Sequence, residues 1–256
     1  MTIENEETKE DNVLFHMPSD PEMFLAAWVT VIDFHQRRQI RNTVQQIWLA
    51  NIPEELKWIL PTSTPWLFTV GWKTQKKWDF EFYFDKETAY SLSEAAKLHA
   101  TTAFGIQLGT VVEMEIFPKI PAHERDTVPE GEYPPERRIH VFPSTHYSGV
   151  DVMGALVKTY DGLQGRLLLR SGLTREVLKS REDLDLWPGD IVIAERGAVT
   201  YMASCLNCYV IEVYPDTHHR EWMSKWASEG YRMIYGVQDP SRITELILHA
   251  MKDLVS

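Results

Sequence analysis

The sequence predicts a mainly β domain with flanking helices (α+β), in which the strands close into a barrel or jelly roll. Three observations favour this fold: short apolar segments separated by turn residues fill the second half of the chain, an alternating aromatic segment precedes them, and helical spacing dominates the two ends. Closely spaced strands with turns between them are typical of barrels and sandwiches. The predicted strands are residues 139–142, 150–160, 165–171, 175–179, 190–194, 198–203 and 209–214.

The amino-terminal part is predicted to be a disordered lead followed by helices. Residues 1–18 are rich in acids and offer no apolar face, so they are not expected to fold. Ser19, Asp20 and Pro21 are typical of a helix start, and apolar residues recur at helical spacing from there to Trp48. Further helices are expected at 53–58 and 88–101.

An aromatic strand is expected between these helices. Trp78, Phe80, Phe82 and Phe84 alternate with polar residues, which predicts a strand that forms a hairpin with residues 66–72. The aromatic face either packs against the first helix or lines an apolar ligand cavity. In the second case Trp66, Trp78, Phe80 and Phe82 are candidate walls of a substrate site.

The remaining segments complete one predicted domain. A long strand is expected at 105–117, an exposed proline-rich loop at 118–138, and two helices after Pro215. We therefore expect a single domain over residues 19–256. It consists of residues 19–101 (helices plus the aromatic hairpin), 102–215 (the barrel) and 216–256 (the carboxyl-terminal helices).

Charge and composition restrict the partners. The net charge of −11, from 26 basic and 37 acidic residues, opposes binding to nucleic acid. No segment reads as a signal peptide or as a membrane span, and only Cys205 and Cys208 are present, which favours a reducing, cytoplasmic environment. A hydrophobic small molecule is the expected partner, and a homo-oligomer is compatible with the sequence.

One segment resembles a known motif. Pro188-Gly189-Asp190 forms a predicted turn into a strand, Gly197 allows the next bend, and residues 209–214 supply a second strand. With residues 160–167 this pattern resembles the second motif of cupins. Metal-dependent cupins need imidazole ligands, but Thr200 and Tyr201 follow Gly197 here and no His-x-His pair occurs. The barrel is therefore expected to hold no metal and no other cofactor.

The order of helices, barrel and two closing helices is similar to that of the fungal sterol isomerase and sigma-1 receptor family. Residues 52–58, 146–149 and 237–239 resemble segments of that family, and Glu212 falls where the family has a buried glutamate. The resemblance implies an apolar cavity with two buried acids. Glu212 would be a catalytic acid whose pKa is raised by burial, with Asp151 favoured over Asp161 as its partner.

Hydroxyl groups beside the predicted strands complete the candidate site. A phenol could bond a substrate oxygen or orient Glu212, and half-buried packing is the alternative for each one. Tyr201 joins Glu212 and Asp151 in the predicted catalytic set. Tyr147, Tyr160 and Thr200 join the aromatic residues as predicted substrate-binding groups.

These expectations combine into a metal-independent isomerase or cyclase. Its substrate would be a hydrophobic, terpenoid- or polyketide-like molecule held in an apolar barrel cavity. A pericyclase of a biosynthetic pathway is one form that this enzyme could take. One alternative is a non-catalytic protein that binds a hydrophobic ligand. Another is a metal-dependent cupin oxygenase that uses His140 and His146 with Glu113 or Glu115. Glycine-rich nucleotide-binding motifs and Gly-x-Ser-x-Gly are absent.

Overall fold

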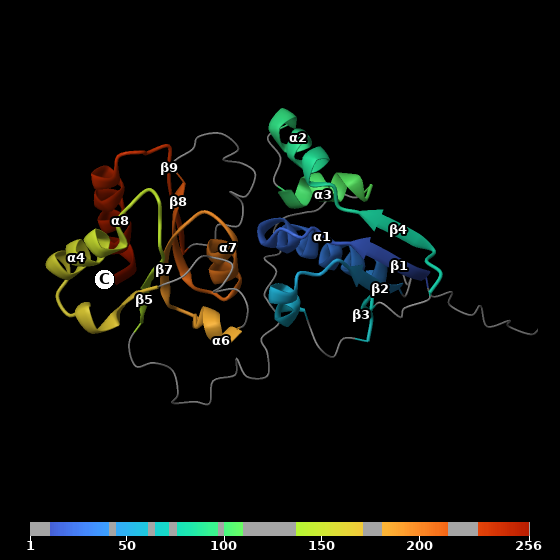
Figure 1. Ribbon diagram of the computed structural model, residues 1–256, viewed down its shortest axis with the longest axis horizontal. Helices are drawn as coiled ribbons and strands as arrows, with labels where there is room; N and C mark the ends of the chain where they lie inside the picture. Colours follow the sequence, from blue (N-terminus) through green and yellow to red (C-terminus); the bar gives the residue numbers. More distant parts are fainter. Residues whose placement is uncertain are drawn as a thin grey trace, which may run out of the picture. The chain divides into compact units, whose positions relative to one another are not determined.

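The computed structural model describes residues 11–40, 45–60, 65–71, 76–96, 100–109, 137–170, 181–214 and 230–255. The chain divides into two compact units, Met1–Pro118 (unit 1) and Lys119–Ser256 (unit 2). Each unit is built on its own sheet, and every strand pair in both sheets is parallel (Figure 1).

Unit 1 is a four-stranded parallel sheet in the order β3-β2-β1-β4. Its elements are β1 (Asp11–His16), α1 (Pro21–Ile40), β2 (Gln45–Ala50), the 3-10 helix η1 (Glu54–Ile59), β3 (Leu67–Thr69), β4 (Phe80–Tyr83), α2 (Lys86–Ala96) and α3 (Ala100–Gln107). Helix α1 connects β1 to the parallel strand β2, as parallel pairing requires a crossover.

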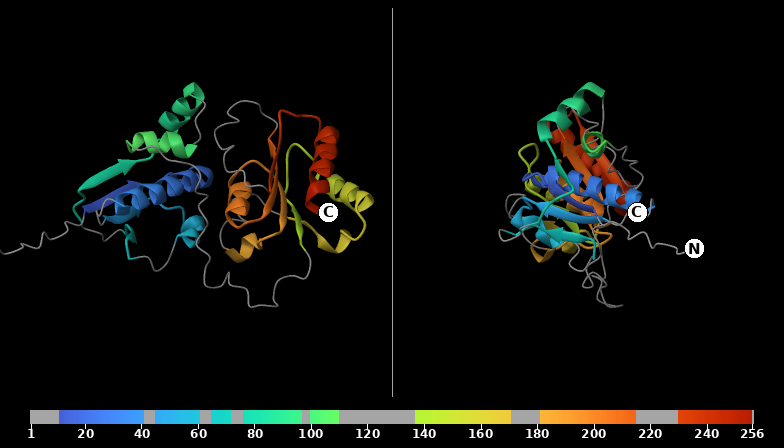
Figure 2. Two further views of the ribbon diagram at one scale, coloured as in Figure 1. Left: turned by 180° about the vertical axis from the view of Figure 1, so that it is seen from behind. Right: turned by 90° about the vertical axis from the view of Figure 1, so that its right-hand side faces the viewer.

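Aromatic packing holds α1 against the unit 1 sheet. Phe15 of β1 is fully buried, and its ring stacks on Phe82 of β4 with centroids 5.3 Å apart. Phe34 of α1 meets the Phe15 ring edge-on at 5.4 Å. Such ring pairs add about 0.5–1.5 kcal/mol beyond their area burial, so this group stabilises the crossover. Figure 2 shows α1 running along the unit 1 sheet.

Unit 2 is a five-stranded parallel sheet in the order β6-β5-β7-β8-β9. Its elements are β5 (Ile139–Val141), α4 (Gly149–Thr159), the 3-10 helix η2 (Gln164–Arg166), β6 (Leu167–Leu169), α6 (Arg181–Leu184), β7 (Ile191–Glu195), α7 (Ala198–Cys205), β8 (Tyr209–Tyr214), β9 (Tyr231–Tyr235) and α8 (Pro240–Val255).

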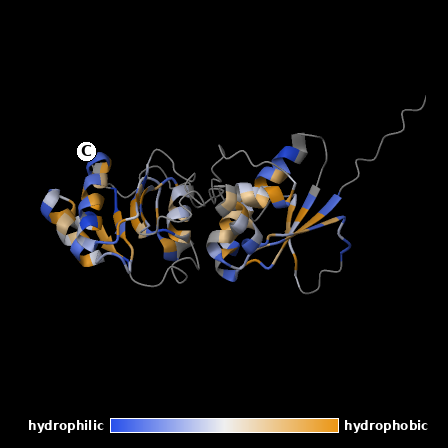
Figure 3. Ribbon diagram, turned by 90° about the horizontal axis from the view of Figure 1, so that it is seen from above, coloured by the Kyte–Doolittle hydropathy of each residue, from blue (hydrophilic) through white to orange (hydrophobic). Residues whose placement is uncertain are grey.

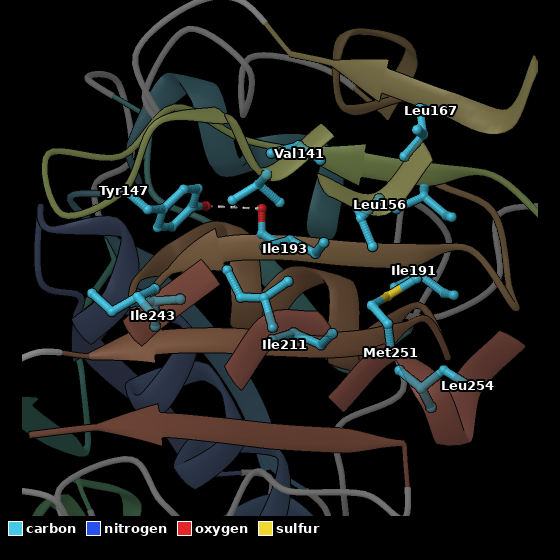
Figure 4. Packing of buried hydrophobic residues seen from close by; sticks show 14 of the residues in the cluster. Val141, Tyr147, Leu156, Leu167, Ile191, Ile193, Ile211, Ile243, Met251 and Leu254 are labelled. Atoms are coloured by element: carbon cyan, nitrogen blue, oxygen red, sulfur yellow. Dashed lines mark hydrogen bonds between the residues drawn. The ribbon is translucent and has the colours of Figure 1, made fainter. Parts of the chain in front are cut away.

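Helices cover both faces of the unit 2 sheet. On one face, Ile193 and Ile211 pack with Leu156 of α4 and Met251 of α8, all fully buried (Figure 4). Because side chains alternate along a strand, Glu212 points to the other face, where α7 contacts β7 and β8. Hydrophobic colour follows the strands, while α4 and α8 carry both colours, as helices with one buried face should (Figure 3).

The parallel sheets correct the predicted fold. A cupin barrel or jelly roll is an antiparallel structure, and no antiparallel pair joins the described strands of either sheet. Parallel strands buried on both faces read as continuous apolar runs, and Ile191–Ala194 is such a run. The same run fits a barrel strand equally well when its neighbours are unknown, and this ambiguity misled the sequence interpretation.

Two predicted strands are helices. Residues 150–159 lie in α4, where the Ser148 hydroxyl caps the helix by accepting the Asp151 N–H at 3.3 Å. Residues 198–203 lie in α7, which starts after Gly197. Both segments contain β-branched residues, whose strand propensity is overridden by tertiary packing of the apolar side chains. The strands predicted at 139–142, 190–194 and 209–214 correspond to β5, β7 and β8, with bounds that differ by at most one residue. Of the strand predicted at 165–171, only Leu167–Leu169 form β6, because residues 165 and 166 belong to η2.

The amino-terminal expectations also need correction. Residues 11–16 of the predicted disordered lead form β1, and residues 45–48 of the predicted helix belong to β2. The aromatic hairpin is wrong, because β3 pairs with β2 and β4 pairs with β1. The chain folds as two units rather than as one cupin-like domain. The strand predicted at 175–179, the loop up to residue 136 and the helix around Trp222 lie outside the described residues.

Candidate functional site

Each sheet has one position where its strand order reverses. In unit 1 the chain builds β1, β2 and β3 outward and then returns to place β4 beside β1. In unit 2 it builds β5 and β6 and then places β7 on the other side of β5. Ligands of open parallel sheets bind at the carboxyl ends of the strands that flank such a reversal. The candidate sites are therefore the carboxyl ends of β5 and β7 and those of β1 and β4.

At the unit 2 reversal, the loop after β5 holds the last residue of β7. The Glu195 oxygen Oε1 accepts the Ser144 hydroxyl at 2.6 Å, the Thr145 N–H at 2.6 Å and the Thr145 hydroxyl at 3.1 Å. The Ser144 oxygen in turn accepts the N–H of His146 at 2.9 Å. These bonds fix one end of the carboxylate in a defined orientation.

The described residues bond the Glu195 carboxylate through one oxygen only. No hydrogen bond from the described residues reaches Oε2, and the side chain is 33% exposed. Burial disfavours the charged form, but the hydrogen bonds from Ser144 and Thr145 outweigh it and lower the pKa of Glu195. At neutral pH the group is an ionised acceptor that the described residues orient through Oε1.

Positive charge lies next to Glu195 at the start of α7. Arg196 donates from Nε to the Tyr201 hydroxyl at 2.9 Å, and its guanidinium lies 4.4 Å from the centre of the Tyr214 ring. The first turn of α7 carries no acid, whereas the first turn of α4 carries Asp151. Because a helix amino end attracts negative charge, an anionic group is stabilised at α7 and is repelled by Asp151 at α4.

A buried polar group lies beneath α7. Glu212 is 1% exposed, and its Oε2 accepts the Thr200 hydroxyl at 2.9 Å and the Tyr231 hydroxyl. Burial raises the pKa of Glu212, although the bond from Tyr231, the charge of Arg196 and the bond from Thr200 all act in the opposite direction. Burial and the neighbouring Glu212 carboxylate raise the pKa of Tyr231.

At the unit 1 reversal, His16 ends β1 and Tyr83 ends β4. The His16 Nε2 and Glu81 Oε1 atoms are 2.6 Å apart, and Tyr83 donates its hydroxyl to the same oxygen at 2.8 Å. The His16 and Tyr83 rings stack with centroids 4.0 Å apart. The hydrogen bonds from His16 and Tyr83 lower the pKa of Glu81.

Unit 2 has a further polar group, which lies at the opposite, amino edge of its sheet. Asp190 accepts from Arg138 at 2.8 Å and lies 3.0 Å from His140 Nε2. Burial raises the pKa of Asp190, but the bonds from His140, Arg138 and the Trp187 N–H outweigh it and bring the value to about 2. These groups join the starts of β5 and β7, which is a structural role.

The predicted aromatic walls all lie in unit 1, and Glu212 lies in unit 2. Trp66 stacks on His35 at 3.8 Å, and Trp78 lies 5.4 Å from Trp48. Phe82 packs against Phe15, while Phe80 is 45% exposed at the sheet edge. The described ring contacts of Trp66, Trp78 and Phe82 are therefore all with residues of unit 1.

The other predicted site residues lie in unit 2, and few of them meet. The Tyr147 hydroxyl lies within hydrogen-bond distance of two carbonyl oxygens, those of Phe142 and Ile193, and that of Tyr160 donates to the Leu248 carbonyl at 2.7 Å. Asp151 is exposed in the first turn of α4. The Thr200 hydroxyl bonds Glu212 directly. The Tyr201 hydroxyl accepts a bond from Arg196, whose charge acts on Glu212.

The fold overturns the predicted activity. An isomerase or cyclase of apolar substrates, a hydrophobic-ligand carrier and a cupin oxygenase all required a barrel cavity, and the described strands form open parallel sheets instead. Within the described ranges, no three His, Cys, Asp or Glu side chains are grouped as metal ligands. The helices described here include none that is long and apolar enough to cross a membrane.

Sequence reasoning missed the residues at the two reversals. Glu195 directly follows the apolar run Ile191–Ala194 and precedes Gly197, and this is how a buried parallel strand ends before a helix. His16 ends a similar apolar run, Val13–Phe15, which was assigned to the disordered lead. An acid or imidazole immediately after such a run was the available signal.

Comparisons with known proteins do not identify a family for this chain. No family model matches the chain, and no curated protein matches it. One solved structure, the Escherichia coli ADP-heptose LPS heptosyltransferase II, is similar with a TM-score of 0.48 and 11% identity. The match covers 96% of this chain and 100% of that one. A similarity this remote assigns neither a family nor an activity.

Proposed function

We propose that unit 2 binds a small, hydroxyl-bearing anionic molecule, such as a nucleotide or a sugar phosphate, at the carboxyl ends of β5 and β7. The observation that carries this proposal is the Glu195 carboxylate, held through Oε1 by Ser144 and Thr145 and open at Oε2. It ends a strand at the reversal of the sheet, where open parallel sheets bind their ligands.

The chemistry of Glu195 selects hydroxyl groups. An ionised carboxylate only accepts hydrogen bonds, so its partner must be a donor. Two neighbouring hydroxyls, as on ribose or another sugar, suit such an acceptor, in the way that acids of parallel α/β folds bond ribose. Each bond to the charged group contributes about 1.5–3 kcal/mol.

The anionic part of the ligand would lie at the start of α7. Arg196 and the amino end of that helix both favour negative charge there. No glycine-rich nucleotide motif is present. The phosphate would therefore depend on these groups, and modest affinity is expected.

Calorimetry with defined probes tests this proposal. ADP, UDP and ribose 5-phosphate are titrated into the full chain, with 2′,3′-dideoxy-ADP as the analogue that lacks both ribose hydroxyls. Glu195→Gln keeps an oxygen for Ser144 but loses the charge, so we expect it to weaken ADP binding about tenfold or more. The matched control is Glu245→Gln on α8, whose side chain is 64% exposed.

The analogue separates a ligand contact from a structural effect. If Glu195 bonds the ribose, the dideoxy analogue binds more weakly than ADP to the wild type, and this difference shrinks in Glu195→Gln. An undiminished difference would exclude Glu195 as the partner of the hydroxyls. Absence of binding by every probe at millimolar concentration would overturn the proposed function.

A specific observation in unit 1 favours a second function, proton transfer by an enzyme. With a proton on Nε2, His16 donates to Glu81, and Nδ1 becomes an acceptor to which no described residue is bonded. An imidazole oriented by a carboxylate is suited to accept a proton from a substrate hydroxyl. The Tyr83 ring stacks on the imidazole and restricts its orientation.

Chemical modification tests the imidazole without a known substrate. Diethyl pyrocarbonate reacts with neutral imidazole, and the extent of reaction at His16 is followed by peptide mass spectrometry. We expect Glu81→Gln to slow the reaction several-fold, because the orienting charge is lost, while Glu54→Gln on η1 leaves it unchanged. An equal rate in Glu81→Gln and the wild type would exclude activation of His16 by Glu81.

A further inference from the structure

The hydroxyl of Thr200 lies within hydrogen-bond distance of two acceptor oxygens but has one proton. Its Oγ1 lies 2.9 Å from Glu212 Oε2 and 2.8 Å from the Gly197 carbonyl oxygen, and it accepts the Gly197 N–H at 3.2 Å. A threonine hydroxyl carries one proton, so it donates to one of these oxygens at a time. The side chain is completely buried, away from bulk solvent.

The protonation state of Glu212 decides which acceptor receives this proton. An ionised carboxylate is the stronger acceptor and draws the hydroxyl proton away from Gly197. A protonated Glu212 needs fewer donors and can itself donate, so the Thr200 proton turns to the Gly197 carbonyl. Gly197 is the residue that precedes α7 and directly follows Glu195 and Arg196.

We propose that Thr200 relays the protonation state of Glu212 to Gly197 and thereby sets the geometry of the Glu195–Gly197 turn at the ligand site. Glu212 and Thr200 are positioning residues in this scheme, since neither touches the ligand. Only the expected effect on ligand binding rests on the proposed function. The coupling itself is a property of the unliganded chain.

The surroundings of Glu212 make the relay specific. Among the described residues, the ionisable groups that face it are Tyr231 of β9 and Arg196 of the turn after β7. Tyr231 donates to Glu212 and also lies within reach of the Thr200 hydroxyl. The phenol keeps its proton at neutral pH, because burial and Glu212 raise its pKa. Arg196 keeps its charge, so Glu212 is the member of this group that changes charge.

Nuclear magnetic resonance of the ligand-free full chain tests the relay. The carboxyl carbon of Glu212 and the amide of Gly197 are followed over the pH range in which the protein stays folded. We expect both signals to titrate with one midpoint, above the ordinary range of a glutamate. In Glu212→Gln, the Gly197 titration should disappear.

Variants of Thr200 separate the relay from a change in folding. Thr200→Ser keeps the hydroxyl and should keep the Gly197 titration, whereas Thr200→Val should abolish it while Glu212 still titrates. The proposal is overturned if Gly197 does not follow Glu212 in the wild type, if it still does so in Thr200→Val, or if Glu212 does not titrate at all. The affinity for ADP, measured at pH values on both sides of the midpoint, then tests whether the relay affects ligand binding. A chain that does not bind ADP would contradict the proposed function but not the relay.

Discussion

Removal of the Tyr231 hydroxyl should destabilise unit 2 in a pH-dependent manner. Tyr231 and Thr200 are the described donors to Glu212 Oε2, so Tyr231→Phe leaves the buried carboxylate with one donor of two. A hydrogen bond to a charged group contributes about 1.5–3 kcal/mol, and one between neutral groups about 0.5–1.5 kcal/mol. We therefore expect a loss of about 2–3 kcal/mol where Glu212 is ionised and about 1 kcal/mol where it is protonated.

The sign of the pH dependence follows from burial. Burial raises the pKa of Glu212 above its value in the unfolded chain, so the folded protein binds more protons between the two values. Stability is therefore full below the unfolded pKa and falls as the pH rises through the folded pKa. Loss of the Tyr231 bond raises the folded pKa further and extends this fall to higher pH.

Urea unfolding at several pH values measures the effect. Hydrogen exchange of β8 peptides reports unit 2 separately from unit 1, and the free energy of unfolding is extrapolated to water. Tyr235→Phe is the control on the same strand, because its side chain is 40% exposed, and a change of less than about 0.5 kcal/mol is expected. A loss that is equal at all pH values would refute the bond between Tyr231 and the carboxylate.

Further predictions concern packing, a helix and the unit 1 site. Leu156→Ala should lower the free energy of urea unfolding of unit 2 by about 2–5 kcal/mol, because this fully buried side chain of α4 leaves a cavity. Gly154→Ala should raise it by about 0.5–1 kcal/mol, since the exposed helix position has open space for a methyl group, whereas Gly189→Ala at φ +90° should lower it. His16→Phe should raise the pKa of Glu81 toward its ordinary value in a carboxyl-carbon titration, and an unchanged pKa would exclude the bond.

Local segments of the fold could be predicted, but their pairing could not. Apolar runs located β5, β7 and β8, and the Ser19-Asp20-Pro21 signal located the start of α1. A run such as Ile191–Ala194 does not encode whether its neighbours are parallel, since both faces are buried in either case. The predicted barrel was therefore wrong in its strand pairing, and the predicted activity was wrong because it depended on a barrel cavity.

The candidate site was predictable only in part for the same reason. Glu212 interrupts the apolar run of β8, so its burial could be expected from the sequence. Thr200 was predicted as a substrate-binding group, and its contact with Glu212 was not predicted. The contact between Ser144 and Glu195 joins residues separated by 51 positions, which requires the order of the strands. His16 and Glu81 are separated by 65 positions, and the same limit applies to them.

The division of the chain at residue 118 has a consequence for biosynthesis. Every strand of the first sheet precedes this point and every strand of the second follows it, so no strand has to wait for a partner from the other unit. Domains generally fold as units during translation, which adds about 5–20 residues per second to the chain. The strands of the first sheet are therefore all synthesised, and can pair, before the ribosome reaches β5.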